Sequence, residues 1–316
     1  MSSASAELIP FVPRITVEWL QDTPELRWLE RDGTISFVDI SGFTAMSERL
    51  SNLGRAGAEE VTDVMNATFS ALLDVAYAQG GGLLKFGGDA LLLLYDGDDH
   101  AARAARAAFE MRRTLRAIGR PRTSAGSVML KMHAGLHSGR FQFFLVGASH
   151  RELLVTGPGA TRVVEMEAAS EAGEILVSPE TAALLEPGVL GDDKGPGKLL
   201  QAAPAAIGEL MPMPDVGSTP IEVAVPAPLR AQLLDVGPLE GEHRHAAVAF
   251  VRFAGTDEIV ATEGAAAAAE ALEALVATIQ AAADEHDVTV LESDIDRDGG
   301  RIILVAGAPH TCGDDE

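Results

Sequence analysis

The spacing of hydrophobic and polar residues changes period repeatedly between residues 34 and 169, and each change predicts a new element. Runs rich in β-branched and aromatic residues predict strands, and apolar residues recurring every three or four positions predict helices. The predicted strands are 34–38, 83–86, 91–95, 128–136, 141–146 and 152–155, and the predicted helices are 58–79, 100–118 and 158–169. Their order indicates an α+β fold, a ferredoxin-like palm with one antiparallel sheet and helices on one face.

A proline-rich segment follows this first domain, which we assign to residues 28–190. Nine of the 16 prolines lie between Pro187 and Pro238, and only two short pieces there, 207–211 and 221–225, have an ordered pattern. This composition predicts a linker over 191–242. A structureless insertion of that length inside one domain is uncommon.

The remaining residues, 243–316, repeat the opening pattern. A strand at 246–253, a helix over 261–285 and strands at 288–291 and 302–306 follow in that order. Arg252 lies 213 residues after Asp39, and Arg301 lies 212 residues after Asp89, which favours a pseudo-repeat. The second copy holds only half the elements of the first, so we expect either a fragment or a truncated second domain.

Composition and charge narrow the class of protein. The 316 residues carry 24 basic and 47 acidic side chains, a formal charge of −23, which argues against binding nucleic acid or an anionic membrane. The single cysteine, Cys312, excludes an internal disulfide framework and a cysteine-cluster zinc site. No apolar run approaches the roughly 20 residues of a membrane span, and no signal peptide is evident. We expect a cytoplasmic protein.

Two aspartates are the strongest candidates for chemistry. Asp39 ends the first predicted strand, and Asp89 lies at the tip of the predicted hairpin. If these strands are neighbours, the two carboxylates lie side by side and suit Mg²⁺ with substrate phosphates. Ser41-Gly42-Phe43-Thr44 would offer backbone N–H groups at a helix start to a phosphate. The structural alternative, a capping Asp39 and a turn residue Asp89, is about equally probable on spacing alone.

Three stretches resemble the signature motifs of class III nucleotidyl cyclases. They are Phe-Val-Asp-Ile-Ser-Gly-Phe-Thr-Ala-Met at 37–46, Leu-Lys-Phe-Gly-Gly-Asp-Ala-Leu-Leu at 84–92 and Ala-Gly-Leu-His-Ser-Gly at 134–139. Within that family the chain is most similar to the soluble, bicarbonate-responsive adenylyl cyclases, which have two tandem cyclase domains. The resemblance covers 34–185 well and 244–309 weakly.

The resemblance implies a set of site residues. Asp39, Asp89 and the carbonyl of Ile40 would hold two Mg²⁺ or Mn²⁺ ions. The phosphates would be bound by a second set, namely Ser41, Gly42, Phe43, Thr44 and one of Lys131 or His133. Lys85 would contact the base or a bicarbonate-like regulator; the alternative is a solubilising lysine at a strand edge. For His133, an ordinary structural position in the sheet is an equally good interpretation.

The chain also departs from the family pattern. Thr161 and Glu165 stand where the resemblance implies an asparagine and an arginine that stabilise the transition state. A glutamate there would repel developing phosphate charge. In the second copy, Arg252 and Arg301 stand where we align the two aspartates, as expected for a partner domain without metal, although both could be plain surface residues. The counterpart of Lys85 falls at Glu292 or Arg297, which leaves ATP and GTP open.

The resemblance therefore implies a nucleotidyl cyclase that converts ATP to cyclic AMP and pyrophosphate in signal transduction. Its composite site would need intramolecular pairing of two cyclase-like domains, or assembly with another chain. A silent nucleotide-binding or regulatory module is the main alternative. A guanylate cyclase, or a diguanylate cyclase suggested by Gly87-Gly88-Asp89-Ala90, ranks lower.

Overall fold

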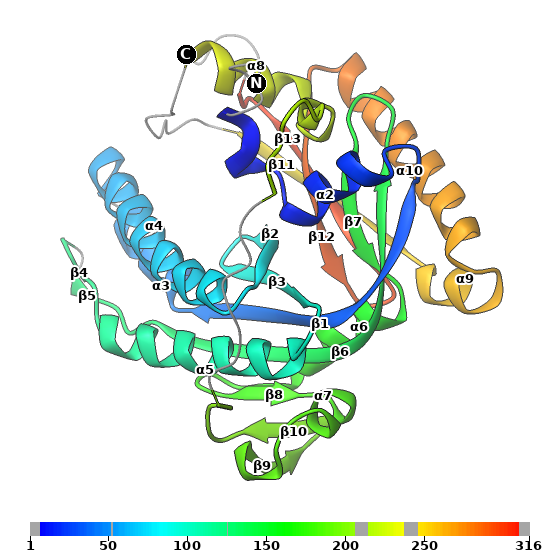
Figure 1. Cartoon of the computed structure of the whole chain (residues 1–316). Coiled ribbons are helices and arrows are strands. Elements are labelled where there is room, and N and C mark those ends of the chain that lie inside the picture. Colours follow the sequence, from blue (N-terminus) through cyan, green and yellow to red (C-terminus); the bar gives the residue numbers. More distant parts are fainter. Residues whose placement is uncertain (1–6, 52, 125, 206–213, 237–245, 310–316) are drawn as a thin grey trace. The chain divides into compact units, whose positions relative to one another are not determined.

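The structure is a computed structural model that describes residues 7–51, 53–124, 126–205, 214–236 and 246–309 (Figure 1). These residues form two compact units. Unit 2 comprises 32–140 and 162–205, and unit 1 comprises 7–31, 141–161 and the described residues between 214 and 309. The predicted α+β class is confirmed, because each unit combines a sheet with helices. The predicted purely antiparallel sheet is wrong for unit 2, since residues 134–136 pair in parallel with residues 175–177.

Unit 2 contains most of a large sheet whose strand order is β2-β3-β1-β6-β8-β10-β9. Strands β1 and β3 form an antiparallel pair that runs from Gly33 opposite Asp96 to Asp39 opposite Ala90. The strands are β1 (Trp28–Ser41), β2 (Gly82–Gly87), β3 (Ala90–Asp96), β6 (Lys131–Val146), β8 (Ile175–Val177), β9 (Leu190–Lys194) and β10 (Gly197–Leu200), with a separate hairpin of β4 (Arg122–Thr123) and β5 (Gly126–Ser127). The helices are α3 (Phe43–Ser51), α4 (Arg55–Ala78), α5 (His100–Ile118), α6 (Pro158–Ala169) and α7 (Pro179–Ala183), with the 3-10 turn η2 (Pro187–Val189).

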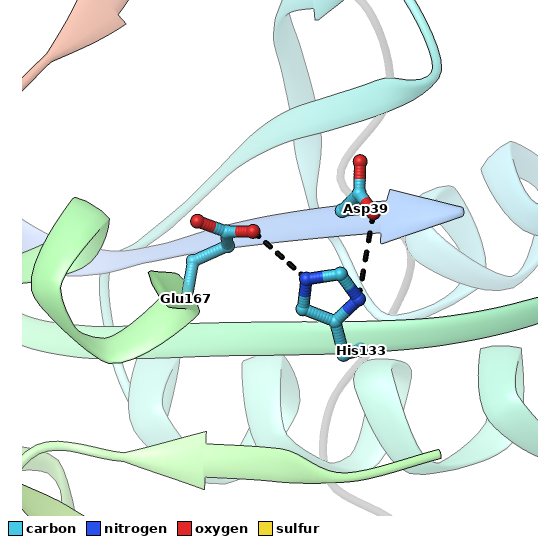
Figure 2. Close-up of side chains that lie close together, drawn as sticks. All are labelled: Asp39, His133 and Glu167. Atoms are coloured by element: carbon cyan, nitrogen blue, oxygen red, sulfur yellow. Dashed lines mark hydrogen bonds and ion pairs between the residues drawn. The ribbon is translucent and has the colours of Figure 1, made fainter. Parts of the chain in front are cut away.

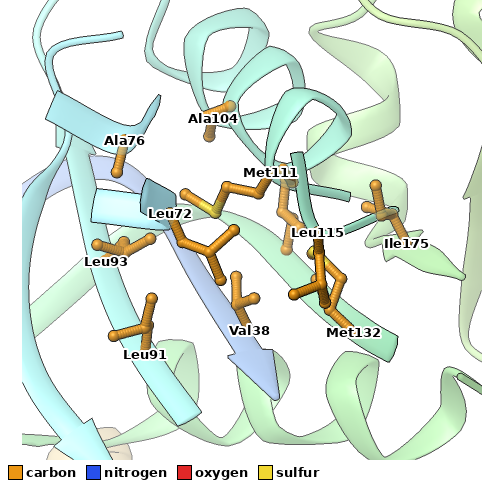
Figure 3. Packing of buried hydrophobic residues seen from close by; sticks show 14 of the residues in the cluster. Val38, Leu72, Ala76, Leu91, Leu93, Ala104, Met111, Leu115, Met132 and Ile175 are labelled. Carbon is orange, nitrogen blue, oxygen red and sulfur yellow. The ribbon is translucent and has the colours of Figure 1, made fainter. Parts of the chain in front are cut away.

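The core of unit 2 lies between the sheet and helices α4 and α5 (Figure 3). Ala104, Ala108, Met111 and Leu115 recur at helical spacing on α5 and are all buried. They pack with Leu72 of α4 and with side chains that alternate along the strands, such as Val38 and Leu91. Burial of this face fixes which side of β1 faces the core, so Asp39, one residue beyond Val38, lies on the opposite side.

Unit 1 combines the end of β6 and strand β7 (Glu152–Thr156) with a three-stranded sheet of order β11-β13-β12. Its remaining elements are β11 (Ala247–Ala254), β12 (Thr289–Asp296), β13 (Gly299–Ala306), α2 (Arg14–Asp22), α8 (Ala227–Val236), α9 (Thr256–Thr262), α10 (Ala265–Glu285), η1 (Ile9–Phe11) and η3 (Ile221–Ala224). Among the described helices, α10 alone has the length and composition of a membrane span, but Ala268, Leu272 and Val276 of α10 are buried in this core. Part of its apolar surface is therefore used in packing inside the unit, with 33% of the apolar window buried.

One side chain of α10 ties it to the loop between β6 and β7. Gln280 is 1% exposed, and its Oε1 accepts hydrogen bonds from the amides of Ala148 at 2.7 Å and Ser149 at 3.0 Å. Its Nε2 donates to the carbonyl of His150 at 2.9 Å. The amide group thus substitutes for secondary-structure partners that the loop backbone lacks.

We expect Gln280→Ala to destabilise unit 1 by about 1 kcal/mol, because it removes a buried side chain whose oxygen accepts hydrogen bonds from the amides of two exposed loop residues, Ala148 and Ser149. Urea unfolding measures the loss, and hydrogen exchange at Ala148 and Ser149 should become faster. Glu270→Ala, at an exposed position of the same helix, is the matched control. Equal stability of the two variants would contradict the role assigned to Gln280.

Several predicted elements are confirmed and others need correction. The helices at 100–118 and 158–169 and the hairpin around Gly88-Asp89 are present. The strands predicted separately at 128–136 and 141–146 are one strand, β6. Ser138-Gly139-Arg140 has the composition of a turn but remains extended. Two side-chain contacts to β1 hold it: Ser138 hydrogen-bonds Thr34, and Arg140 pairs with Asp32.

The predicted linker is more ordered than expected at its start. Strands β9 and β10 form a hairpin over 190–200 and join the sheet of unit 2. Here Pro196 belongs to the turn of a hairpin rather than to a connection between domains. The short piece at 221–225 is ordered as η3, whereas 207–211 and Cys312 lie outside the described residues. The domain boundaries themselves stay a prediction.

Residues 247–306 follow the same order of elements as the first half, strand, two helices and a hairpin, with the hairpin's second strand in the centre of the sheet. Their hairpin turn is Arg297-Asp298, not Gly299-Gly300-Arg301. The predicted alignment of Arg301 with Asp89 is therefore wrong, since Asp298 occupies the turn position that Asp89 has. The prediction took Gly299 and Gly300 as turn residues, but they begin strand β13. Gly299 is required there because a Cβ atom would lie 2.1 Å from the carbonyl oxygen of Phe253.

Candidate active site

Asp39 and Asp89 lie together, as the sequence predicts. Asp39 is near the end of β1 opposite Ala90, the residue that follows Asp89. The amide of Ile40 donates a hydrogen bond of 3.1 Å to the carbonyl of Asp89, which ties the hairpin turn to the end of β1. Antiparallel pairing of two strands thus brings together carboxylates fifty residues apart in the sequence.

The electrostatics of this pair favour a cation. The pKa of Asp39 is raised to about 6, first by burial and then by the neighbouring Asp89 carboxylate, with His133 acting in the opposite direction. Two carboxylates that share a half-buried place repel one another until a proton or a metal ion compensates them. The donor set, two carboxylates beside the backbone of Ile40, therefore fits a divalent cation such as Mg²⁺ or Mn²⁺.

A histidine and a glutamate complete the cluster (Figure 2). His133 on β6 places Nδ1 3.4 Å from Oδ2 of Asp39 and Nε2 2.9 Å from Oε1 of Glu167 on α6. The hydrogen bond to Glu167 raises the pKa of His133 against the effect of burial. Of the two predicted phosphate contacts, the structure brings His133 to the aspartates, while Lys131 is exposed at the start of β6.

Glu167 was not predicted, because nothing in its local sequence distinguishes it from other helix glutamates. Its position depends on Gly135, over which α6 crosses β6. A Cβ atom on Gly135 would lie 2.1 Å from the backbone nitrogen of Glu167. The glycine of the stretch 134–139 therefore allows the helix to approach closely enough for Glu167 to reach His133.

The predicted phosphate loop is a tight connection between β1 and α3, and its role in binding phosphate stays a prediction. Ser41 ends β1 and Phe43 begins α3, and between them Gly42 has φ +114°, a conformation that favours glycine. A Cβ on Gly42 would lie 2.8 Å from the carbonyl of Met129. Phe43 is buried and stacks on Phe69 of α4 with 5.7 Å between ring centroids, which fixes the start of α3.

Lys85 is not a solubilising lysine. It lies on β2 and is only 9% exposed, although β2 is an edge strand of the sheet. The neighbouring Phe86 packs edge-on against Phe69, the ring that also contacts Phe43. Burial argues for a specific role of this amino group, and contact with a base or a regulator stays a prediction.

Thr161 and Glu165, the two residues that depart from the family pattern, both form contacts with other side chains or backbone groups. In unit 2, Glu165 forms an ion pair of 2.8 Å with Arg162. In unit 1, Oγ1 of Thr161 accepts a hydrogen bond of 2.8 Å from the amide of Asp298. Neither side chain supplies the positive charge that a phosphate transition state requires.

The second sheet lacks a matching pair of free carboxylates in its described part. Arg252 and Arg301 lie opposite each other on β11 and β13 and pair with Asp296 and Asp294, at 3.1 and 2.8 Å. The carboxylate of Asp298 instead accepts hydrogen bonds of 3.1 Å from the amides of Gly255 and Asp257 at the start of α9. Within the described residues, the cluster with metal-ligand spacing is Asp39, His133 and Glu167.

The raised pKa of Asp39 predicts a pH-dependent stability without metal. Between about pH 4 and pH 6 the folded chain keeps a proton that the unfolded chain releases, so the folded state loses stability as the pH rises through this range. We expect Asp39→Asn to stabilise the metal-free protein at pH 7.5 but not at pH 4, by on the order of 1 kcal/mol because solvent partly screens a carboxylate that is not fully buried. Thermal melts in a chelator measure this. Asp63→Asn, exposed on α4, should show no such dependence.

Comparison with known proteins places more than half of the chain in one family. Residues 30–199 match the family model described as "Adenylate and Guanylate cyclase catalytic domain". Adenylate cyclase type 10 of Homo sapiens is 48% identical over 67 residues, which are 20% of this chain and 4% of that protein. The membrane guanylyl cyclase of Dictyostelium discoideum is 28% identical over 171 residues, 52% of this chain and 11% of that protein. Adenylate cyclase 1 of Rhizobium meliloti is 30% identical over 132 residues, 40% of this chain and 19% of that protein.

Solved structures of cyclase domains are also similar to the chain. The adenylyl cyclase CyaB from P. aeruginosa has a TM-score of 0.45 and 24% identity, covering 58% of this chain and 100% of that one. The guanylate cyclase domain of RhGC from Catenaria anguillulae, in complex with GTP, has a TM-score of 0.45 and 23% identity, covering 54% of this chain and 94% of that one.

Proposed function

The chain belongs to the adenylate and guanylate cyclase catalytic domain family, and from this we propose that it is an adenylate cyclase module that converts ATP to cyclic AMP and pyrophosphate. The observation that carries the proposal is the paired Asp39 and Asp89 beside the Gly42 loop. Preference for ATP is supported by similarity to two adenylate cyclases, type 10 of Homo sapiens over 67 residues and adenylate cyclase 1 of Rhizobium meliloti over 132 residues.

In the proposed reaction, the 3′-hydroxyl of ATP loses its proton and attacks the α-phosphate. The new O3′–P bond closes the ring as the bond from the α-phosphate to pyrophosphate breaks. Two Mg²⁺ or Mn²⁺ ions, when bound, would supply the charge that activates the hydroxyl and neutralises the leaving group. Asp39, Asp89 and the Ile40 carbonyl would hold them.

The other residues would orient the nucleotide. The backbone N–H groups of Gly42, Phe43 and Thr44 would bind the β- and γ-phosphates, with Ser41 beside them. Phe43 stacks on Phe69, and a contact of this kind would favour binding by reducing the conformational entropy that the loop loses when the nucleotide binds. Lys85 would contact the base or a small regulator.

The groups that stabilise the transition state would come from elsewhere. Thr161 and Glu165 cannot replace an asparagine and an arginine, since glutamate repels the developing phosphate charge. We propose that a second cyclase-like domain, in the same protein or in another chain, completes the site. Cyclic nucleotide formation would then require that partner.

A catalytically silent nucleotide-binding module is the second candidate. It is favoured by the ion pair of Glu165 with Arg162 and by the use of Asp298 as a helix cap. Such a module would bind nucleotide and signal through a partner without turning it over.

One experiment separates the two. Calorimetric titration with a non-cyclisable ATP analogue and Mn²⁺ measures binding, and chromatography of reactions with Mn²⁺ and ATP or GTP measures product, both on the whole protein. Binding with cyclic AMP as product supports the cyclase, and binding without product supports the silent module. Cyclic GTP as the main product would overturn the substrate assignment, and absence of binding would overturn both functions.

A further inference from the structure

We infer that His133 is a nitrogen ligand of the cation that Asp39 holds, and that Glu167 positions His133 for this task. The site would then prefer ions that accept an imidazole ligand, such as Co²⁺, Zn²⁺ or Mn²⁺, over Mg²⁺. The inference rests on the proposed function, because it presupposes a cation at Asp39 and Asp89.

The hydrogen bonds of the imidazole decide which ring nitrogen is free. Nε2 lies 2.9 Å from Oε1 of Glu167 and donates a hydrogen bond to it, since a carboxylate oxygen is an acceptor. In the neutral ring Nδ1 then carries a lone pair. A histidine that binds a metal through one nitrogen commonly donates the other N–H to a carboxylate, and that second group fixes the tautomer and the orientation of the ring.

The free nitrogen is directed at a carboxylate rather than at a donor. Nδ1 of His133 is buried and has no hydrogen-bond partner within the described part of the chain, and it lies 3.4 Å from Oδ2 of Asp39 (Figure 2). Two hydrogen-bond acceptors at this separation repel each other. A cation in contact with both atoms removes the repulsion and uses both lone pairs.

The cluster has the spacing of a metal site. One ligand atom from each of Asp39, His133 and Glu167 lies within 4.8 Å of the other two. The side chains come from β1, β6 and α6, and they are 24%, 16% and 18% exposed. Three separate elements of unit 2 therefore hold them in place, and Gly135 sets the approach of α6.

Ligand chemistry then gives the selectivity. Mg²⁺ is bound through oxygen and keeps several waters. Imidazole nitrogen suits Zn²⁺ and its neighbours in the transition series, whose affinity for a mixed nitrogen and oxygen site exceeds that for an oxygen-only site. Replacing His133 should therefore weaken the binding of Co²⁺ more than that of Mg²⁺.

The test uses the whole protein and the metal salts alone. Calorimetry measures the affinities for Co²⁺ and Mg²⁺ of the unaltered protein and of four variants: His133→Asn, Glu167→Gln, Asp39→Asn and the control His286→Asn, whose histidine is exposed at the end of α10. Proton NMR of the Co²⁺-loaded protein records paramagnetically shifted, exchangeable imidazole protons.

We expect His133→Asn to weaken Co²⁺ binding about tenfold or more, to change Mg²⁺ binding by less than about threefold, and to remove the shifted proton. Glu167→Gln should weaken Co²⁺ binding about 10- to 100-fold, as for other groups that orient a metal-binding histidine. Asp39→Asn should weaken both ions, and His286→Asn neither.

Two results would overturn the inference in different ways. If Asp39→Asn abolishes binding while His133→Asn keeps the Co²⁺ affinity and the spectrum, His133 is an imidazolium held between two carboxylates, and the proposed metal site stands without it. If Asp39→Asn also changes nothing, the metal site of the proposed function fails as well. If His133→Asn is unfolded, two other measurements test whether His133 binds the metal. They are the paramagnetically shifted imidazole proton of the unaltered protein and the Co²⁺ affinity of Glu167→Gln.

Discussion

Asp39→Ala and Asp89→Ala are each expected to reduce cyclic nucleotide formation by at least about a thousandfold in any assembly of the protein that turns over ATP. Losing one carboxylate of the pair removes a ligand of the cations that would activate the hydroxyl and neutralise pyrophosphate, effects worth several kcal/mol of barrier. Calorimetry should show a parallel loss of Mn²⁺-dependent binding of the ATP analogue.

The matched control is Asp63→Ala, an exposed aspartate on α4 of the same unit. It removes the same charge from unit 2 without touching the pair, so its turnover and binding should equal those of the unaltered protein. Thermal melts show whether each variant is folded. Full turnover by a folded Asp39→Ala or Asp89→Ala variant would refute the assignment of the active site.

Gly135→Ala is expected to have the largest effect on stability, about 3 kcal/mol in the free energy of unfolding. The added Cβ would meet the backbone of α6, 2.1 Å from the nitrogen of Glu167 and 2.6 Å from its Cα. Backbone cannot rotate away as a flexible side chain can, so α6 must move off the sheet. That movement would also withdraw Glu167 from His133 and weaken cation binding.

Gly188→Ala is the control for this substitution, because a Cβ at Gly188 meets no atom within 4 Å. Urea unfolding of both variants measures the difference. If the two variants unfold at the same urea concentration, the close approach of α6 to β6 does not constrain unit 2 in the way that the structure implies.

The sequence predicts the aspartate pair correctly because a strand end and a hairpin tip have strong local signals. Asp39 follows a β-rich run, and Asp89 follows two glycines between apolar runs. Placing both on neighbouring strands then requires only the ordinary pairing of a hairpin with an adjacent strand. The observed register of Asp39 opposite Ala90 agrees with that expectation.

Other parts of the site depend on contacts between distant residues, which local patterns do not encode. Glu167 reaches His133 only because α6 crosses β6 at a glycine. Lys85 is buried although it lies on an edge strand, where a lysine is ordinarily solvated. Short segments such as β9 and β10 were missed because proline and glycine mark both hairpin turns and linkers.

The helix cap made by Asp298 has a consequence for any attempt to graft a second metal centre into this protein. Ala254 faces Gly299, the residue after Asp298, just as Asp39 faces Ala90 after Asp89. In an Ala254→Asp variant, the carboxylate of Asp298 would still accept hydrogen bonds from the amides of Gly255 and Asp257 at the start of α9. If Asp298 bound a cation instead, α9 would lose these capping hydrogen bonds. A cation site in unit 1 would therefore first require another residue to cap α9.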